Sequence, residues 1–272
     1  MAETAPIIEF KRVSKSFGRQ RVLDDIDLRV ERGRTTVIMG RSGTGKSVLL
    51  KHIVGLLHPD RGEVWFDGTR IDTLYEQALY RIRQRISFVF QLNALFDSMT
   101  VAENIAFQMI ENNPGRVDRK RIDDLVRESL ETVGLAGFEK KRPAELSGGE
   151  KKRVAIARGI ALDPPPAVIL YDEPTAGLDP QRSDVITRLI RDLQHREGVT
   201  GIVVTHDIKL ATEVGDRILI LRGGRFIADG APAEVMASPN EYVQRFVQGI
   251  AEPEDLRPLA EDDEPAVPAG RR

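Results

Sequence analysis

The stretch that decides the fold reads Gly40-Arg-Ser-Gly-Thr-Gly-Lys-Ser47. It follows the pattern G-x-x-x-x-G-K-[ST], in which a glycine-bent loop turns backbone N–H groups toward phosphate oxygens. The short apolar run Thr35–Met39 precedes this loop, and a helical apolar period runs on from Lys46 through Leu57. A strand, a glycine loop and a helix in this order open a βαβ unit, so we expect a phosphate group at the start of the helix.

Two side chains of this loop have predicted chemical roles. Lys46 is expected to reach the β and γ phosphates of a nucleotide, and the Ser47 hydroxyl to ligate Mg²⁺. A chance glycine-rich turn is the alternative, and the flanking strand and helix disfavour it. The predicted nucleotide contacts of this segment are Gly40, Arg41, Ser42, Gly43, Thr44, Gly45, Lys46, Ser47 and Val48.

A second candidate element is the apolar strand that ends in Asp172 and Glu173. A buried parallel strand delivers such residues to the carboxyl edge of the sheet, beside the phosphate loop. There Asp172 is expected to join the Mg²⁺ shell, and Glu173 to polarise the water that attacks the γ phosphate. The alternative is an acidic pair that only caps the next helix.

The charge balance and the absence of cysteine exclude several classes of protein and of site. The chain has 272 residues, 40 Lys and Arg against 42 Asp and Glu, and no cysteine. The balanced charge argues against a nucleic-acid binder, and the lack of cysteine excludes disulfides and thiolate metal sites. The first six residues do not form a signal peptide, and no apolar run approaches the roughly 18–20 residues of a membrane helix. We therefore expect a soluble or peripheral protein made in the cytoplasm.

The order of the elements predicts an α/β fold. Residues 7–13 and 26–30 suggest a small antiparallel β region, and residues 62–68 a hairpin. Residues 93–162 have mainly helical periods and look like an insert, with helices over 101–110, 122–133 and 150–161. Strands and helices then alternate (167–171, 181–196, 201–205, 217–221), which predicts a mostly parallel sheet covered by helices. We expect one domain over 1–250, closed by a helix over 242–250. The tail 251–272 is rich in proline and acidic residues, so we expect it to be extended or disordered.

A distinctive motif begins at Leu146 and reads Leu-Ser-Gly-Gly-Glu. Ser147 and Glu150 fit the capping box of a helix, and the two glycines permit close approach of an anion or another backbone. With the phosphate loop, Gln91, Asp172-Glu173 and His206 in their order, the chain from about 7 to 249 resembles the ABC ATPase family, whose signature is usually LSGGQ. The fold implied is the P-loop NTPase fold of ABC type.

The resemblance implies further roles. Phe17 matches the aromatic that stacks on adenine, although tyrosine is more usual there and a core phenylalanine is the alternative. Gln91 matches the glutamine that touches Mg²⁺ and water and senses the membrane partner. His206 matches the switch histidine at the γ phosphate. The residues expected to act across a dimer of two copies are Ser147, Gly148, Gly149, Glu150 and Asp179, and the implied cofactors are ATP and Mg²⁺.

Some residues depart from the pattern or lie outside it. Glu150 replaces the usual glutamine and places a carboxylate near the nucleotide of the other copy. Gly177 stands where alanine is common, which should matter little. The other three histidines match no motif, and we interpret them as surface or packing residues. The basic run 151–153 resembles a phosphate-binding patch, but we interpret it as a solvated helix face.

A closer resemblance is carried by Gly45-Lys-Ser-Val-Leu-Leu-Lys-His52, Asn93-Ala-Leu-Phe96 and the segment 243–251. These look like the ATPases of the Mla/Mce lipid-transport systems. That resemblance implies transmembrane permease subunits, a periplasmic MCE lipid-binding protein and, in some bacteria, a STAS-domain protein. It also implies a peripheral position on the cytoplasmic face of the inner membrane, with phospholipid as cargo.

The alternative functions are transport of another cargo and a soluble ABC protein outside transport. Within transport, the cargo could be an amino acid or a lipoprotein. Soluble ABC proteins of DNA repair carry long coiled coils between their nucleotide motifs, and the segment 47–172 is too short for them. Ribosome-acting ABC proteins carry two cassettes, whereas this chain has one.

Overall fold

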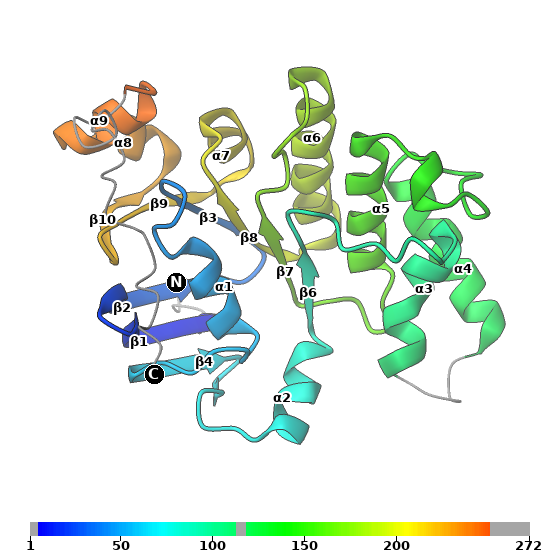
Figure 1. The fold of residues 1–272 in the computed structure, drawn as a ribbon, viewed down its shortest axis with the longest axis horizontal. Coiled ribbons are helices and arrows are strands. Elements are labelled where there is room, and N and C mark those ends of the chain that lie inside the picture. Colours follow the sequence, from blue (N-terminus) through cyan, green and yellow to red (C-terminus); the bar gives the residue numbers. More distant parts are fainter. Residues whose placement is uncertain (1–4, 113–117, 251–272) are drawn as a thin grey trace, which may run out of the picture.

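The structure is a computed structural model that describes residues 5–112 and 118–250. Its centre is a six-stranded sheet in the order β10-β9-β3-β8-β7-β6, with helices above and to one side of it (Figure 1). Five of these strands are parallel, and β10 pairs with β9 in the antiparallel sense. The strands are β3 (Thr35–Met39), β6 (Ile86–Val89), β7 (Val168–Asp172), β8 (Thr200–Thr205), β9 (Arg217–Arg222) and β10 (Arg225–Gly230). The predicted mostly parallel sheet is confirmed.

A second sheet of four antiparallel strands lies on the other side of helix α1 (Lys46–Ile53), in the order β2-β1-β4-β5 (Figure 1). Its strands are β1 (Ile8–Phe17), β2 (Gln20–Val30), β4 (Arg61–Phe66) and β5 (Thr69–Arg70). The bend where β4 meets β1 requires a glycine, because a Cβ on Gly62 would lie 2.3 Å from the carbonyl oxygen of Arg12. The antiparallel region and the hairpin therefore lie where the alternation of apolar residues predicted them.

The central sheet divides the hydrophobic interior into two cores. Along β3, Val37 and Met39 belong to a core shared with the helices that follow β6, whereas Ile38 belongs to a core shared with α1 and the antiparallel sheet. This division follows from the strand itself, in which successive side chains point to opposite faces. Both faces are buried, which is why these strands are continuous apolar runs in the sequence.

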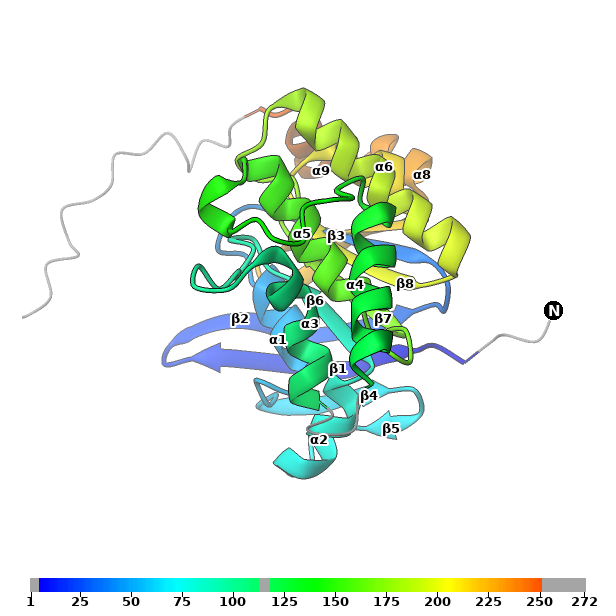
Figure 2. The ribbon, with the colours of Figure 1, turned by 90° about the vertical axis from the view of Figure 1, so that its right-hand side faces the viewer.

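The helices form two groups. Helices α3, α4 and α5 lie side by side beyond the β6 edge (Figure 2), while α6 to α9 follow the later strands. Their bounds are α2 (Glu76–Arg83), α3 (Val101–Asn112), α4 (Arg119–Thr132), α5 (Gly148–Ile160), α6 (Pro180–Glu197), α7 (Ile208–Val214), α8 (Pro232–Met236) and α9 (Glu241–Val247), with a short 3₁₀ turn at Pro143–Glu145.

Some boundaries differ from the sequence prediction. Helix α1 ends at Ile53 and does not reach Leu57, because the chain turns at Gly55, which has φ 64°. Helices α2, α7 and α8 were not predicted. Each is eight residues or shorter, and in α2 only Leu79 is buried, so the sequence carries too weak an apolar period to reveal it. None of the described helices is both long and apolar enough to span a membrane. The predicted tail 251–272 lies outside the described residues.

Candidate active site

The phosphate loop contains two glycines, Gly40 and Gly45, at which a side chain would clash with neighbouring residues. A Cβ on Gly40 would lie 2.7 Å from the carbonyl oxygen of Leu221, and one on Gly45 would lie 2.7 Å from a methyl carbon of Val22. Gly45 also has φ 102°, which is unfavourable for residues with a side chain. The loop thus lies tightly against β9 and β2, and its backbone shape is fixed before any ligand binds.

The start of α1 suits an anion. Gly45 is the residue before the helix, and no side chain caps it. By contrast, Ser147, Asp179 and Asp207 cap the starts of α5, α6 and α7 with their own side chains. The first N–H groups of any helix lack partners within it, and they carry the positive end of the helix dipole. At α1 these groups are left for a ligand, as a phosphate requires.

Lys46 is buried beneath the loop. Its side chain donates hydrogen bonds to the carbonyl oxygens of Gly40 (2.7 Å) and Arg41 (3.0 Å), and its Nζ lies 3.7 Å from Glu173 Oε1. Burial lowers the pKa of Lys46, while the charges of Glu173 and Asp172 act to raise it. The ammonium is therefore held at the inner side of the loop, next to the predicted catalytic carboxylate.

Ser47 and Asp172 bring two oxygens together. The Ser47 hydroxyl donates to Asp172 Oδ1 over 3.3 Å, although 125 residues separate them in the chain. Mg²⁺ prefers hard oxygen ligands, and it usually takes one or two from the protein and the rest from phosphates and water. The pair fits that requirement. Burial raises the pKa of Asp172, and the hydrogen bond from Ser47 opposes this.

Glu173 lies at the centre of the site. Its Oε2 is 2.9 Å from His206 Nδ1 and accepts a hydrogen bond from the Thr205 hydroxyl over 3.3 Å. The backbone of Glu173 has φ 49°, an unfavourable conformation for a residue with a side chain, which often occurs at functional sites. The carboxylate of Glu173, whose backbone is strained, and the His206 ring thus lie together where β7 and β8 end, with the carboxylate next to Lys46 of the phosphate loop.

Gln91 lies just after β6, at the same edge, and its side chain is exposed. Its backbone oxygen accepts a 2.5 Å hydrogen bond from Lys152 Nζ on α5. Lys152 is 2% exposed, so the interpretation of the basic run 151–153 as a solvated face is wrong at this position. No residue pattern around Lys152 predicts its burial, because this burial depends on segments far away in the chain.

The capping box at the start of α5 is confirmed. Glu150 Oε2 accepts from the Ser147 N–H over 2.7 Å, and the Ser147 hydroxyl accepts from the Glu150 N–H over 3.4 Å. The hydrogen bond from Ser147 holds the pKa of Glu150 below its usual value. A carboxylate therefore performs the same capping that the usual glutamine would. Close by, a Cβ on Gly149 would lie 3.2 Å from the Arg182 side chain of α6.

Asp179 caps α6 by accepting from the Arg182 N–H over 3.0 Å. Phe17 is 47% exposed at the end of β1, with the Lys15 ammonium 5.7 Å from the centre of its ring. The hydrogen bonds that Ser147 and Asp179 accept come from the first turns of their own helices, α5 and α6. The structure therefore gathers Lys46, Ser47, Asp172, Glu173 and His206 at the phosphate loop, with Gln91 at the same edge of the sheet, whereas the contacts of Phe17, Ser147 and Asp179 lie elsewhere.

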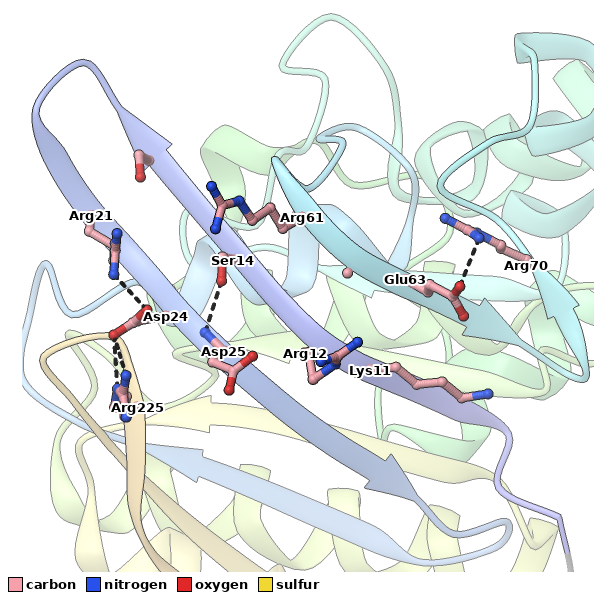
Figure 3. A pocket seen from close by; sticks show the side chains of 12 residues that line it. Lys11, Arg12, Ser14, Arg21, Asp24, Asp25, Arg61, Glu63, Arg70 and Arg225 are labelled. Atoms are coloured by element: carbon pink, nitrogen blue, oxygen red, sulfur yellow. Dashed lines mark hydrogen bonds and ion pairs between the residues drawn. The ribbon is translucent and has the colours of Figure 1, made fainter.

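A charged hollow of about 950 Å³ lies elsewhere, on the outer face of the antiparallel sheet (Figure 3). Its charges are largely paired with one another: Asp24 is bound by Arg21 and Arg225, and Glu63 by Arg70. It is lined entirely by residues outside the predicted site. The hollow is therefore not part of the phosphate chemistry.

Residues 23–176 match the sequence profile of the ABC transporter family. The chain belongs to this family. As such it binds ATP, hydrolyses it and powers a membrane transporter, as the order of the motifs predicts.

Relatives of the chain share most of its length. It is 39% identical over 248 residues to the "Intermembrane phospholipid transport system ATP-binding protein MlaF" of Escherichia coli (strain K12), covering 91% of each chain. It is 38% identical over 262 residues to the "Probable ribonucleotide transport ATP-binding protein mkl" of Mycobacterium tuberculosis (strain ATCC 25618 / H37Rv), covering 94% of this chain and 72% of the relative. It is 40% identical over 258 residues to the chloroplastic protein trigalactosyldiacylglycerol 3 of Arabidopsis thaliana, covering 89% and 74%.

Solved structures confirm the ABC fold. The dimeric ATP-binding cassette MJ0796 in a post-hydrolysis state bound to ADP and Pi superposes with a TM-score of 0.75 at 34% identity, covering 83% of this chain and 98% of the other. The cbiO1 cassette of Clostridium perfringens, part of the cbiONQ transporter complex, gives a TM-score of 0.79 at 32% identity, covering 86% and 92%.

Proposed function

We propose that this ATPase drives an Mla/Mce-type phospholipid transporter between bacterial membranes. The observation that carries the proposal is the 39% identity to a phospholipid-transport ATPase over 91% of both chains. The plant relative is also named after a lipid, trigalactosyldiacylglycerol. The mycobacterial relative is named for ribonucleotide transport, so the cargo has to be decided by experiment.

The geometry supports a role for each residue of the gathered site. The phosphates of ATP lie along the loop and the start of α1, where Lys46 compensates the charge of the β and γ phosphates. Ser47, Asp172 and Gln91 would hold Mg²⁺, which would neutralise phosphate charge. Glu173 accepts a proton from the attacking water, and His206 contacts the γ phosphate while its Nδ1 stays 2.9 Å from Glu173. ATP and water become ADP and phosphate.

The residues that lie apart act across a dimer in this proposal. Ser147 and Gly148 present the start of α5 to the nucleotide of a second copy, and Asp179 lies at that same boundary. Phe17 stacks on adenine from its exposed position at the end of β1. The support is the separation of these residues from the phosphate loop of their own chain, together with the dimeric state described for the cassette MJ0796.

The proposed partners are transmembrane permease subunits, a periplasmic MCE lipid-binding protein and a STAS-domain protein. The ATPase would lie on the cytoplasmic face of the inner membrane, bound to its permease. The chain from 1 to 250 would form the cassette, with residues 93–162 as a helical insert and 251–272 as a tail.

The test is purification of the tagged chain from membranes of its own host. The expected result is a complex with a permease and an MCE protein that contains bound phospholipid. A strain that lacks the chain should also show altered lipid asymmetry in its outer membrane, and the wild-type chain should restore it. A complex with no lipid, and lipid asymmetry that ignores the deletion, would refute phospholipid as the cargo. Normal uptake of labelled ribonucleotides in the strain that lacks the chain would refute ribonucleotides as the cargo.

A further inference from the structure

Lys152 is an unusual residue for a helix interior. It lies on α5, five residues after the capping residue Ser147, and its side chain is almost completely removed from solvent. Burial of an ammonium group is costly unless hydrogen bonds and opposite charges compensate it. A methionine at this position would fill similar space without that cost. The partners of the ammonium therefore indicate what it does.

The ammonium of Lys152 joins two segments of the site. Its Nζ donates to the carbonyl oxygen of Gln91 over 2.5 Å and reaches that of Glu173 over 3.4 Å. We propose that Lys152 is a positioning residue for ATP hydrolysis, which holds the Gln91 backbone and the Glu173 backbone at a fixed separation. The proposal rests on the assignment of Glu173 as the residue that accepts a proton from water.

Glu173 needs such support because its backbone is strained. A left-handed conformation at a residue with a side chain is unfavourable and persists only where the surroundings enforce it. The N–H of Glu173 donates to the Val204 carbonyl over 2.9 Å, and its carbonyl accepts from the Ala176 N–H over 3.2 Å and from Lys152. Lys152 is thus the contact that ties this strained residue to α5.

The Gln91 loop is held to the same helix at a second point. Asn93 and Ala94 both have positive φ angles, of 63° and 48°, and their carbonyl oxygens accept from Arg158 over 2.7 and 2.6 Å. Two cations of α5 therefore fix this loop, and the one nearer the start of the helix also reaches Glu173. A shift of the loop relative to α5 would pull on the Glu173 carbonyl through Lys152.

Charge supports this arrangement. Burial lowers the pKa of Lys152, and the nearby carboxylates of Asp172 and Glu173 act to raise it. Lys46 faces Glu173 from the phosphate loop. The carboxylates of Asp172 and Glu173 and the two ammonium groups therefore lie close together with balanced formal charge. This balance compensates part of the cost of burying Lys152.

The test compares Lys152→Met, which removes the donor and keeps the length, with Lys152→Gln, which keeps an N–H donor without the charge. The matched control is Lys151→Met on the same turn, because Lys151 has no role in the site. Each variant is assembled with its partners, and kcat, KM for ATP and the affinity for ADP are measured together with the thermal midpoint. We expect Lys152→Met to lower kcat by about 10- to 100-fold, since a misplacement of about 1 Å costs on that order, with ADP affinity within about two-fold of wild type. Lys152→Gln should recover part of kcat, and Lys151→Met should keep it.

Three results would overturn the proposal. The first is a Lys152→Met variant with normal kcat. The second is a loss of ADP affinity as large as the loss of kcat, which would show a general disturbance of the nucleotide site. The third is a slow Lys152→Met variant beside a Glu173→Gln variant with normal turnover, which would show that Lys152 does not act through Glu173. If Lys152→Met does not fold, a folded Lys152→Gln variant decides. A kcat between those of Lys151→Met and Glu173→Gln, with normal ADP affinity, supports the donor role. A kcat equal to that of either variant contradicts it.

Discussion

Replacement of Glu173 by glutamine is expected to separate ATP binding from hydrolysis. Glutamine has nearly the same shape, so its amide oxygen can still accept from the Thr205 hydroxyl, as Glu173 Oε2 does over 3.3 Å. Lys46 keeps its hydrogen bonds to Gly40 and Arg41, which do not involve Glu173. The phosphate loop should therefore keep its shape, and ATP should bind with near wild-type affinity.

The expected loss lies in the chemical step. An amide cannot accept the proton of the attacking water, and a positioned general base contributes about 10²- to 10⁴-fold to a rate. This corresponds to about 3–5 kcal/mol in the activation free energy, at 1.36 kcal/mol for each factor of ten. Glu173 is mostly buried, with 12% of its side chain exposed, so bulk water has little room to replace it as the base. The loss should lie toward the upper end of that range.

The assay is single-turnover hydrolysis of labelled ATP by the assembled protein, with nucleotide binding measured separately. The Glu173→Gln variant should bind ATP, hydrolyse it at less than about a hundredth of the wild-type rate, and accumulate as an ATP-bound closed dimer. A variant with the wild-type single-turnover rate would refute the assignment of Glu173. A variant that fails to bind ATP would refute the separation of the two functions.

Four other changes test further parts of the site. Lys46→Ala should abolish ATP binding or hydrolysis, because it removes the ammonium that is buried beneath the loop, and a normal ATPase rate would contradict the assignment. A heterodimer of Lys46→Ala and Ser147→Ala chains should keep one intact composite site and about half the activity. Full activity of the wild-type chain as a monomer would refute an ATP site composed of residues from two chains. The pKa of Glu150 is lowered in the folded state, so its contribution to stability is present above its unfolded-state pKa and is lost as pH falls through the folded-state pKa. In Glu150→Gln the acid-induced fall in unfolding free energy should be smaller than in wild type, as urea titrations at neutral and acid pH would measure. Gly62→Ala should destabilise the chain by about 1–3 kcal/mol in urea unfolding, because its φ is 90° and the added Cβ would meet the backbone; an unchanged midpoint would contradict this.

The central part of the fold could be predicted because its signals are local. Strand β3 is a run of five buried residues directly before the phosphate loop, and β7 is an apolar run that ends in Asp172. In both cases burial on two faces produces a continuous apolar segment. Helix α2 escaped prediction for the opposite reason, since it rests on the rest of the protein mainly through Leu79.

The site could be predicted only as far as its motifs extend. The pair of Ser47 and Asp172 follows from two short patterns and from the rule that parallel strands end at one edge. The burial of Lys152 depends on Gln91, which is 61 residues away, and on the strained carbonyl of Glu173. Neither the neighbours of Lys152 in the sequence nor its charge shows that these two acceptors converge on it. Long-range hydrogen bonds to backbone atoms leave no residue pattern, so they have to be seen in the structure.

The division of side chains between two cores has a consequence for how the sequence can change. In β3, Val37 packs with the helices and Ile38 with α1 and the antiparallel sheet, so neighbours in the chain adjust to different surroundings. A change in the volume of Ile38 can be compensated by residues of the antiparallel sheet without disturbing α5, which carries Ser147 and Lys152. The core beneath the antiparallel sheet can therefore change in sequence while the core beneath α5 keeps its packing. Because the backbone of the central sheet separates the two cores, each core can accept compensating substitutions independently of the other.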